Sequence, residues 1–256
     1  HERYEENLCK TGHNFYSFKF GKEWDSTYAE VPDNYHIISS IPTSVDFDLV
    51  LSHTSCNRLQ LAHDLLSNTT NCSTNKISIP ILRHCHVLPD IRFDIKDEIS
   101  KFRSIPVDRN SFISDFNRRE WGYNESDAHV IEHGVDTEFW VPDASIEKES
   151  ACLSVVNEWP SRDWCCGFNL WQQTSQGLPV RVYGKCTGEN TGFSSPANDR
   201  EHLRQIYQNS RIFYNTSLHS PVPTVLMEAM ACGCAIVSTS TCMIPEIIEH
   251  GKNGLI

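Results

Sequence analysis

The sequence has few basic residues and no long apolar run. Its 256 residues include 22 Lys and Arg against 33 Asp and Glu, which gives a formal net charge of -11. A protein that binds nucleic acid through bulk electrostatics needs a basic face, so the charge argues against that function. No apolar segment approaches the roughly 20 residues that cross a bilayer. We therefore expect no transmembrane segment, although peripheral contact with a membrane stays open.

The 11 cysteines are scattered and lack the CxxC spacing of a zinc site or a disulfide framework. We expect them to be reduced and mostly buried, which indicates a cytoplasmic protein. The opening residues HERYEENLCK have no resemblance to a signal peptide. Four Asn-x-Ser/Thr triplets point weakly the other way, but chance produces such triplets in a chain rich in these residues, so we do not expect glycosylation. The triplets begin at Asn68, Asn71, Asn124 and Asn215.

Short apolar runs alternate with amphipathic segments, a pattern typical of parallel sheets covered by helices. In the first half we expect strands at residues 15–20, 35–41, 47–53, 78–84, 111–116 and 128–134, with helices at 57–66 and 94–102. In the second half we expect strands at 151–157, 178–185, 211–217 and 234–240, with helices at 166–175, 199–210, 223–232 and 244–250. Each half therefore has the pattern of a doubly wound α/β unit.

The periodicity stops in the stretch VDTEFWVPDASIEKES, where Pro142, Asp143 and a charged run intervene. We place a domain boundary there, giving domains 1–145 and 146–256. The chain opens with an expected helix that no strand and Gly-rich turn precede, and it stops at an expected strand. We therefore expect a fragment that is truncated at both termini.

The segment 221–238, PVPTVLMEAMACGCAIVS, follows an expected strand and begins a helix. Pro223 suits a first helical position, and Gly233 suits a left-handed cap. The helix would begin at the carboxyl end of the strand, where free N–H groups and the helix dipole attract anions such as a diphosphate. Glu228 lies over one turn further in. It could accept hydrogen bonds from sugar hydroxyls, or it could be a solvent-facing helical residue.

The run SPVPTVLMEAMACGCAIVSTSTCMIPEIIEHGKNGLI strongly resembles the donor-binding segment of group 1 glycosyltransferases, a retaining group that includes glycogen synthases and many mannosyltransferases. The run VIEHGVDTEFWVPD resembles the strand and turn that close the first domain of that family. FDLVLSH, SIPILRHCH and SFISDFNRREWG are similar to it more loosely. The resemblance implies the GT-B architecture, in which two Rossmann-like domains face a cleft. The first domain would bind the acceptor and the second the nucleotide-sugar donor.

The resemblance also assigns donor-site residues. Glu228 matches the glutamate that holds the ribose hydroxyls of the donor. The backbone around Pro223, Thr224 and Val225 matches the loop that meets the diphosphate and sugar. Ser220 stands where the family has a second carboxylate, which contacts the transferred sugar. This departure at a catalytic position puts donor specificity and full activity in doubt.

Further donor-site positions lie after the strands of the second half. The family has an arginine and, five residues later, a lysine that compensate diphosphate charge. Asn157 and Arg162 occupy those positions here, so one cation remains, and its planar guanidinium suits phosphate. Lys185 follows another strand and is a weaker basic candidate. Arg162 could instead be a plain surface charge in a loop.

In the first half, His86 follows Pro80 by six residues, the spacing of a family histidine that reaches toward the donor sugar. We take it as the catalytic histidine, while a structural role stays open. His53 and His84 are further candidates for the cleft, and His133 is expected to shape the turn between the domains. In a strand His84 and His86 share a face, which suggests a metal pair, but no third ligand follows at a convincing spacing.

Two other patterns are rejected. Asp46 and Asp48 form the Asp-x-Asp of a metal-binding glycosyltransferase fold, but they precede the apolar run LVL and so lie at the wrong end of that strand. Cys232 and Cys234 could suggest a nucleophile, but no histidine is positioned to activate either of them. We expect these cysteines to pack the end of the helix and expect no metal site.

We therefore expect an enzyme that transfers a sugar from a nucleotide-sugar donor, such as a UDP- or GDP-sugar, to a carbohydrate, lipid or protein acceptor. The resemblance implies retention of configuration, with the leaving phosphate helping to deprotonate the acceptor, and no metal or other cofactor. Two alternatives stay open: a non-catalytic sugar-nucleotide-binding protein, and another GT-B enzyme such as an epimerase or phosphorylase. Glu228→Ala is expected to weaken nucleotide binding with little loss of stability.

Overall fold

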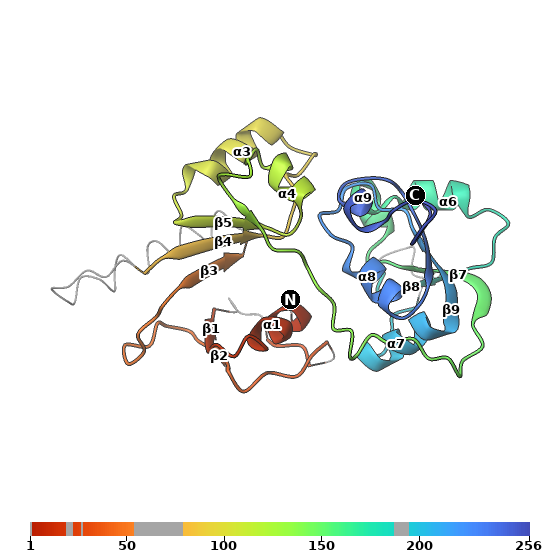
Figure 1. Ribbon diagram of the computed structural model, residues 1–256, viewed down its shortest axis with the longest axis horizontal. Coiled ribbons are helices and arrows are strands. Elements are labelled where there is room, and N and C mark those ends of the chain that lie inside the picture. Colours follow the sequence, from red (N-terminus) through yellow and green to blue (C-terminus); the bar gives the residue numbers. More distant parts are fainter. Residues whose placement is uncertain (1, 19–22, 27, 54–78, 187–194) are drawn as a thin grey trace.

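The computed structural model describes residues 2–18, 23–26, 28–53, 79–186 and 195–256. Two four-stranded sheets, one in each half of the chain, dominate the described residues, and every strand pair in them is parallel. Figure 1 shows the two sheets in separate halves, with the long connection after β6 running between them. The α/β class predicted from the alternating pattern is confirmed.

The N-terminal half begins with a helix and a small parallel strand pair, followed by the four-stranded sheet in the order β3-β4-β5-β6. The predicted helix 57–66 lies outside the described residues. The elements are α1 (Glu2–Cys9), β1 (Phe15–Ser17), β2 (Tyr35–Ile37), β3 (Val50–His53), β4 (Ile81–Cys85), α3 (Ile95–Ser104), β5 (Arg109–Phe112), α4 (Asp115–Glu120) and β6 (His129–Val130).

Aromatic side chains form the core beneath α3. The ring of Phe102 stacks on Trp121 at a centroid distance of 4.1 Å, and Phe112 is fully buried beside them. Arg83 of β4 is also buried. Its guanidinium donates to the Tyr123 hydroxyl (3.1 Å) and to the Phe102 carbonyl. A buried charge whose donors are satisfied in this way can be tolerated in a small core.

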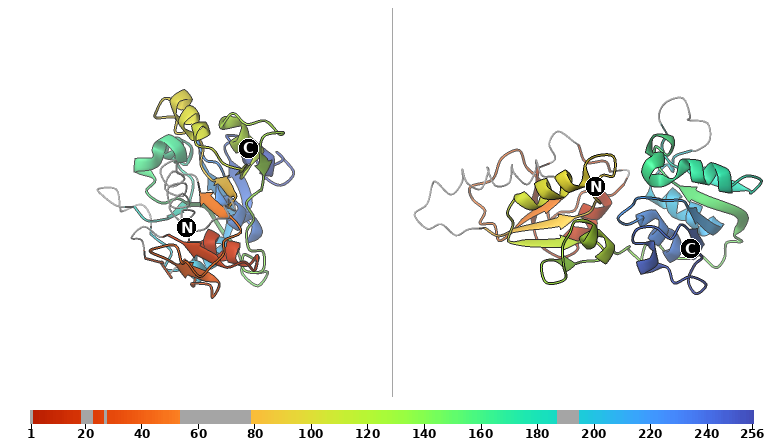
Figure 2. Two further views of the ribbon diagram at one scale, coloured as in Figure 1. Left: turned by 90° about the vertical axis from the view of Figure 1, so that its left-hand side faces the viewer. Right: turned by 90° about the horizontal axis from the view of Figure 1, so that it is seen from above.

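The C-terminal half holds the second sheet, in the order β10-β9-β7-β8. Figure 2 shows it with helices around it. The elements are β7 (Glu149–Val155), η2 (Pro160–Arg162), α5 (Asp163–Cys166), α6 (Phe168–Thr174), β8 (Val180–Tyr183), α7 (Arg200–Asn209), β9 (Ser210–Asn215), α8 (Thr224–Ala231), β10 (Ala235–Ser238) and α9 (Ile244–Ile247).

Helices α7 and α8 share one hydrophobic core with this sheet. Tyr207 of α7 and Leu226 of α8 are fully buried, and they belong to the same cluster as Phe213 of β9 and Ile236 of β10. The amphipathic spacing of α7 explains its placement, because Leu203, which lies one turn before Tyr207, is buried on the same face. This packing fixes α8 against the sheet.

Several predicted elements differ in their bounds, and three of them show the physical reason. The strand expected over 111–116 ends at Phe112, because Ser114 caps α4 by accepting a hydrogen bond from the Asn117 N–H (3.0 Å). The helix expected over 166–175 is divided by Gly167, whose φ of 65° ends α5 and precedes α6. Helix α8 begins at Thr224, so Pro223 is its N-cap and not its first helical residue.

Two of the sets of contacts between the halves lie at the ends of the boundary. At one end of the boundary, the Glu246 carboxylate accepts hydrogen bonds from the N–H groups of Asp115 (3.1 Å) and Phe116 (2.6 Å) at the start of α4. At the other end, α1 meets the C-terminal half, where Glu6 pairs with Arg200 (3.3 Å). In Figure 1, α4 and α9 lie toward the upper end of the boundary, and α1 and α7 lie toward its lower end. The predicted boundary at residue 145 falls in the connection between β6 and β7.

Candidate functional site

The loop between β9 and α8 carries the predicted donor-binding residues and is held from below by α5. The Cys165 carbonyl accepts hydrogen bonds from the Leu218 N–H (2.9 Å) and the His219 N–H (3.0 Å). Gly167 packs so closely under this loop that a Cβ there would meet the Thr216 carbonyl oxygen at 2.1 Å. The loop therefore has a fixed path over the carboxyl end of the sheet.

Glu228, the residue predicted to hold the ribose, is buried in α8 and is only 5% exposed. Its two carboxylate oxygens have separate partners. Oε1 accepts from the Arg3 guanidinium at 3.0 Å, and Oε2 accepts from the Tyr207 hydroxyl at 3.1 Å. Burial raises the pKa of Glu228, while Arg3 and Tyr207 oppose that rise. The solvent-facing alternative for Glu228 is therefore wrong.

The partner Arg3 comes from α1 in the other half of the molecule. Its guanidinium lies 5.6 Å from the ring centroid of Trp140 and 5.7 Å from that of Tyr28. Lys10, at the end of the same helix, pairs with Asp136 at 2.8 Å. Helix α1 thus brings a cation to the Glu228 carboxylate of α8. Truncation in Glu228→Ala leaves Arg3 without this partner, so we now expect the variant to lose stability, and no longer expect its stability to be nearly unchanged.

Three predicted donor-site residues lie together where β7 and β8 end. The side-chain oxygen of Asn157 accepts from the Lys185 N–H at 2.8 Å, and Arg162 Nη1 donates to the Asn157 carbonyl at 3.3 Å. Gly184 is required here, since a Cβ would meet the Val156 carbonyl oxygen at 2.0 Å. Asn157 and Arg162 are exposed. The two cations therefore flank one carboxyl edge of the C-terminal sheet.

Ser220 lies in the loop before α8 and is half-buried. Its neighbour His219 donates a hydrogen bond from Nε2 to the Pro89 carbonyl oxygen (2.9 Å). Pro89 belongs to the loop after β4, so this contact joins the two halves beside Ser220.

Thr224 and Val225 open α8 directly after Pro223, as the predicted strand, loop and helix require. Gly233 has a φ of 78°, which confirms its predicted left-handed conformation.

The structure brings four histidines together at the carboxyl edge of the N-terminal sheet. His53 ends β3, His84 and His86 lie at the end of β4, and His133 follows β6. The rings of His84 and His86 have centroids 4.4 Å apart. Tyr4 of α1 covers the group, with its ring centroid 4.6 Å from that of His86.

Two short contacts connect three of these rings. His53 Nδ1 lies 3.0 Å from His86 Nε2, and His86 Nδ1 lies 3.0 Å from His133 Nε2. His84 instead bonds through Nδ1 to the Ser111 hydroxyl at 2.7 Å. Burial and the neighbouring imidazoles lower the pKa of His84 to about 4 and that of His86 to about 2, and burial lowers the pKa of His133. All three are therefore neutral at pH 7.

The rejected patterns lie where the sequence predicted. Asp46 and Asp48 are exposed and precede β3, at its amino end. Cys232 and Cys234 are buried at the end of α8, and burial raises the pKa of Cys232 to about 12 and that of Cys234 to about 11.

In the part of the chain that the structure describes, no three His, Cys, Asp or Glu side chains are arranged to hold a metal ion. None of the helices described there is long and apolar enough to cross a bilayer.

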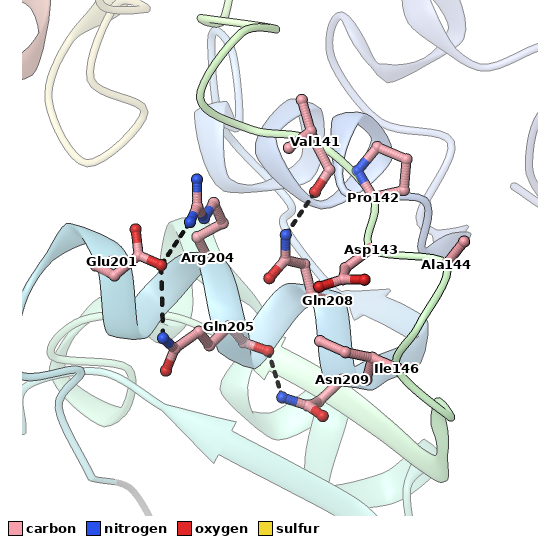
Figure 3. Close-up of a pocket in the computed structure, with 10 residues that line it drawn as sticks. All are labelled: Val141, Pro142, Asp143, Ala144, Ile146, Glu201, Arg204, Gln205, Gln208 and Asn209. Atoms are coloured by element: carbon pink, nitrogen blue, oxygen red, sulfur yellow. Dashed lines mark hydrogen bonds and ion pairs between the residues drawn. The ribbon is translucent and has the colours of Figure 1, made fainter.

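A separate depression of about 520 Å³ lies between α7 and the connection at residues 141–146 (Figure 3). The Gln208 amide donates to the Val141 carbonyl (2.8 Å), and Arg204 pairs with Glu201 (2.6 Å). Its main polar groups are thus already bonded to each other. None of the residues predicted for the donor site lines it, so we do not assign it to the reaction.

Arg3, Tyr4 and Tyr207 are the site residues that sequence reasoning missed. Arg3 and Glu228 are 225 positions apart, so no local spacing could have paired them. Tyr207 offered a weak signal, because it lies on the apolar face of an amphipathic helix next to the predicted donor strand. A buried tyrosine requires a hydrogen-bond partner for its hydroxyl, and Glu228 supplies it.

Comparison with known proteins agrees with this geometry. Residues 183–256 match the family model described as glycosyl transferases group 1. The alpha-maltose-1-phosphate synthase of Mycobacterium tuberculosis H37Rv is 25% identical over 160 residues, which cover 49% of this chain and 41% of that protein. The enzyme of the same name from Mycolicibacterium smegmatis is 35% identical over 54 residues, which cover 21% of this chain and 14% of that protein.

Solved structures show the fold. Anabaena HepE in complex with UDP and glucose has a TM-score of 0.63 at 16% identity, covering 82% of this chain and 63% of that one. Sucrose-phosphate synthase from Thermosynechococcus elongatus has a TM-score of 0.63 at 14% identity, covering 82% and 60%. The chain spans less than half the length of the two curated relatives. The resemblance to group 1 glycosyltransferases and the GT-B fold class are confirmed.

Proposed function

We propose that this protein transfers a sugar from a nucleotide-sugar donor to a hydroxyl of a carbohydrate, lipid or protein acceptor, with retention of configuration. The observation that carries the proposal is the position of Glu228. It lies in the segment that matches the family model, in the helix that follows the carboxyl end of β9. A buried carboxylate with polar partners at that edge suits a ligand with paired hydroxyls.

Each part of the donor would meet a different group. Glu228 would accept the ribose hydroxyls, and the N–H groups at the start of α8 would face the diphosphate. Arg162 and Lys185 supply positive charge as the diphosphate departs, so the proposed reaction needs no metal and no bound cofactor. His86 and the loop at Ser220 would lie against the transferred sugar from the two halves. Contact between the halves would limit access of water to the donor.

The pairing of Glu228 with Arg3 and Tyr207 bears on how a nucleotide could bind. An ionised carboxylate has about four lone-pair positions, and these two donors use two of them. Glu228 is nearly inaccessible in this arrangement. The ribose must therefore displace Arg3 or enter after α1 has shifted, which makes Arg3 part of the donor-binding equilibrium.

A thermal-shift panel tests the proposal. UDP-, GDP- and ADP-sugars are compared with the free sugars, since a ligand that binds only the native state raises the midpoint of unfolding. UDP-glucose is the first choice, because solved structures of similar fold are complexes with UDP and glucose or with UDP-glucose. Glu228→Gln keeps the shape of the side chain and should abolish most of the shift. A panel without any shift would overturn the proposal.

A second candidate is a sugar-nucleotide-binding protein without transferase activity. It is favoured by the two departures from the family pattern, Ser220 in place of a carboxylate and Asn157 in place of a cation. The two candidates differ in turnover. If a nucleotide sugar binds tightly but is neither hydrolysed nor transferred to any acceptor in a panel of sugars, lipids and peptides, the protein binds sugar nucleotides without catalysing transfer.

A further inference from the structure

Two neighbouring cysteines end α5, the one-turn helix beneath the loop that joins β9 to α8 (residues 216–223, the donor loop). Both are free thiols, and Cys165 Sγ lies 3.6 Å from Cys166 Sγ. Cys165 is 5% exposed and Cys166 is 9% exposed, so a bulky reagent is excluded and only a small one can reach the sulfur atoms. The pair is a vicinal dithiol, a group that a two-electron oxidant converts to a disulfide.

The surroundings of Cys165 favour its thiolate. The Cys166 thiol can donate a hydrogen bond to Cys165 Sγ, and the Arg162 guanidinium supplies positive charge. These groups lower the pKa of Cys165 against the effect of burial, whereas the contact with Cys165 and burial raise the pKa of Cys166. One sulfur is thus set to be the nucleophile while the other keeps its proton, which is the division of roles in a reacting pair of cysteines.

The peptide group between the two cysteines also holds the donor loop. The Cys165 carbonyl belongs to this peptide, and it accepts hydrogen bonds from the Leu218 N–H (2.9 Å) and the His219 N–H (3.0 Å). Both donors lie directly before Ser220. The path of the donor loop toward Ser220 therefore depends on the orientation of one peptide group, the one that a bond between the two sulfur atoms would enclose in a ring.

A disulfide would change the orientation of that peptide. Adjacent Cα atoms are about 3.8 Å apart, whereas most disulfides join Cα atoms about 4.4–6.8 Å apart. The sulfur atoms must also approach from 3.6 Å to about 2.05 Å. The last turn of α5 has to open to close this ring, which turns the Cys165 carbonyl away from Leu218 and His219. The same strain makes the bond easy to reduce, as in reversible disulfides.

We propose that Cys165 and Cys166 are a redox modification site, at which a peroxide forms a disulfide that releases the donor loop. The Cys165 thiolate attacks one oxygen of hydrogen peroxide, the O–O bond breaks, and the hydroxide that leaves takes up a proton to become water. The Cys166 thiol then attacks the resulting sulfenic acid, the S–O bond breaks, and a second water leaves. Two thiols lose two electrons and two protons, and one peroxide is reduced to two waters.

Peptide mass spectrometry tests the modification without any substrate. The protein is treated with hydrogen peroxide, and the remaining thiols are then blocked. We expect the peptide that contains both cysteines to lose two hydrogens and to regain them with dithiothreitol. Cys165→Ser and Cys166→Ser should each abolish this change, and Cys152→Ser, at a half-buried cysteine of β7, should retain it. A wild-type peptide that stays reduced, or that gains only oxygen, would overturn the proposal.

Hydrogen exchange tests the release of the donor loop. In the disulfide form, the amides of Leu218 and His219 lose the carbonyl that accepts from them, so we expect them to exchange at least about tenfold faster. Dithiothreitol should restore the slow exchange, and the amides of β10 should be the same in both forms. Unchanged exchange at Leu218 and His219 in a protein that carries the disulfide would overturn the coupling to the loop.

The effect of oxidation on the donor rests on the proposed function. We expect the disulfide to weaken nucleotide-sugar binding about tenfold, a coupling of ordinary size between two sites, and peroxide to leave the affinity of Cys165→Ser unchanged. Equal affinity of the reduced and oxidised wild type would overturn this regulation and leave the transferase function intact. A protein that binds no nucleotide sugar in either form would overturn the function, while mass spectrometry and hydrogen exchange still decide whether the modification site exists.

Discussion

At the carboxyl edge of the N-terminal sheet, four imidazoles and a phenol lie together, and the lowered pKa values of His84, His86 and His133 all favour the neutral ring. The corresponding edge of the C-terminal sheet carries a buried carboxylate and two cations. Both sheets are four-stranded and parallel, so the topology alone does not account for this difference. The loops that leave the strands decide which chemistry each edge offers. A neutral edge suits hydroxyl groups, and a charged edge suits a nucleoside diphosphate.

The largest effect is expected when the charged edge loses its carboxylate. Glu228→Ala leaves the Arg3 guanidinium, whose side chain is 21% exposed, without its partner. We expect the free energy of unfolding to fall by about 3 kcal/mol and the nucleotide affinity to fall about 100-fold. Urea denaturation and calorimetric titration measure the two effects.

The control for this prediction is Glu249→Ala. Glu249 pairs with Lys252 at 2.7 Å on the surface, and both side chains are mostly exposed, so its loss should cost less than about 1 kcal/mol. If Glu228→Ala lowers stability but leaves nucleotide affinity unchanged, Glu228 has a structural role only and the charged edge is not a donor site.

The neutral edge should make stability depend on pH. The pKa of His84 is lowered from 6.5 to about 4 in the native state, so the unfolded chain binds more protons between these values. Stability should therefore be complete above pH 6.5 and fall as the pH drops toward 4, by about 3 kcal/mol for this ring alone. Urea midpoints at pH 7.5, 6 and 5 give the slope.

His84→Asn isolates that contribution, because its amide can still meet the Ser111 hydroxyl. The slope should decrease in this variant, and the exposed His129→Gln should retain the wild-type slope. The raised pKa of Glu228 stabilises the native state as the pH falls, which opposes the effect of His84. Because the wild type and His84→Asn both contain Glu228, its contribution cancels when their slopes are compared. An unchanged slope in His84→Asn would show that the cluster is not neutral in the native protein.

A smaller effect is expected from restoring the missing carboxylate. Ser220→Glu adds to the charged edge the group that the family has at this position, and a hydrogen bond from a sugar hydroxyl to a charged acceptor contributes about 1.5–3 kcal/mol. We expect turnover of the donor to rise about tenfold, measured as release of the nucleoside diphosphate. Ser220→Gln, of similar size, should give little gain. Equal rates in both variants would rule out a role for the charge.

The smallest effect concerns the exposed cation. Arg162→Ala should weaken nucleotide binding about threefold, with the loss decreasing at high salt, because an exposed charge is screened. Stability should change little, since the Arg162 side chain is exposed and its hydrogen bond to the Asn157 carbonyl is long, at 3.3 Å. Arg181→Ala is the control, because Arg181 is an exposed cation of β8 that pairs with Glu149. Equal affinities in the two variants would remove Arg162 from the donor site.

Much of the fold could be predicted from the local sequence pattern. The strands and helices of the C-terminal half were predictable because apolar runs, proline and glycine mark their ends, and α8 with Gly233 is the clearest case. Prediction was wrong at residues 113–116, where apolar residues suggested a strand. Ser114 and Asp115 start a helix there instead. A capping hydrogen bond outweighed the apolar pattern.

The site was predictable only in part, for a physical reason. Parallel strands bring their carboxyl ends to one edge, so His53 and His86 could be expected near each other. Which nitrogens meet, and that His133 also contacts His86, depends on the paths of the loops that follow β4 and β6. The pair between Arg3 and Glu228 depends on how α1 lies against the other half, which no spacing in the sequence encodes.

The two sets of contacts at the ends of the boundary determine how the halves could move apart. The upper contact joins Glu246 to the N–H groups of Asp115 and Phe116, whereas the lower one joins α1 to Glu228 and Arg200. Rotation about the upper contact as a pivot would withdraw Arg3 from Glu228, whereas Tyr4 would stay over the imidazoles, because α1 and the imidazoles belong to the same half. A hinge at α4 and α9 would thus uncover the charged edge and leave the imidazoles covered, so that access to the second edge would need a separate movement of α1.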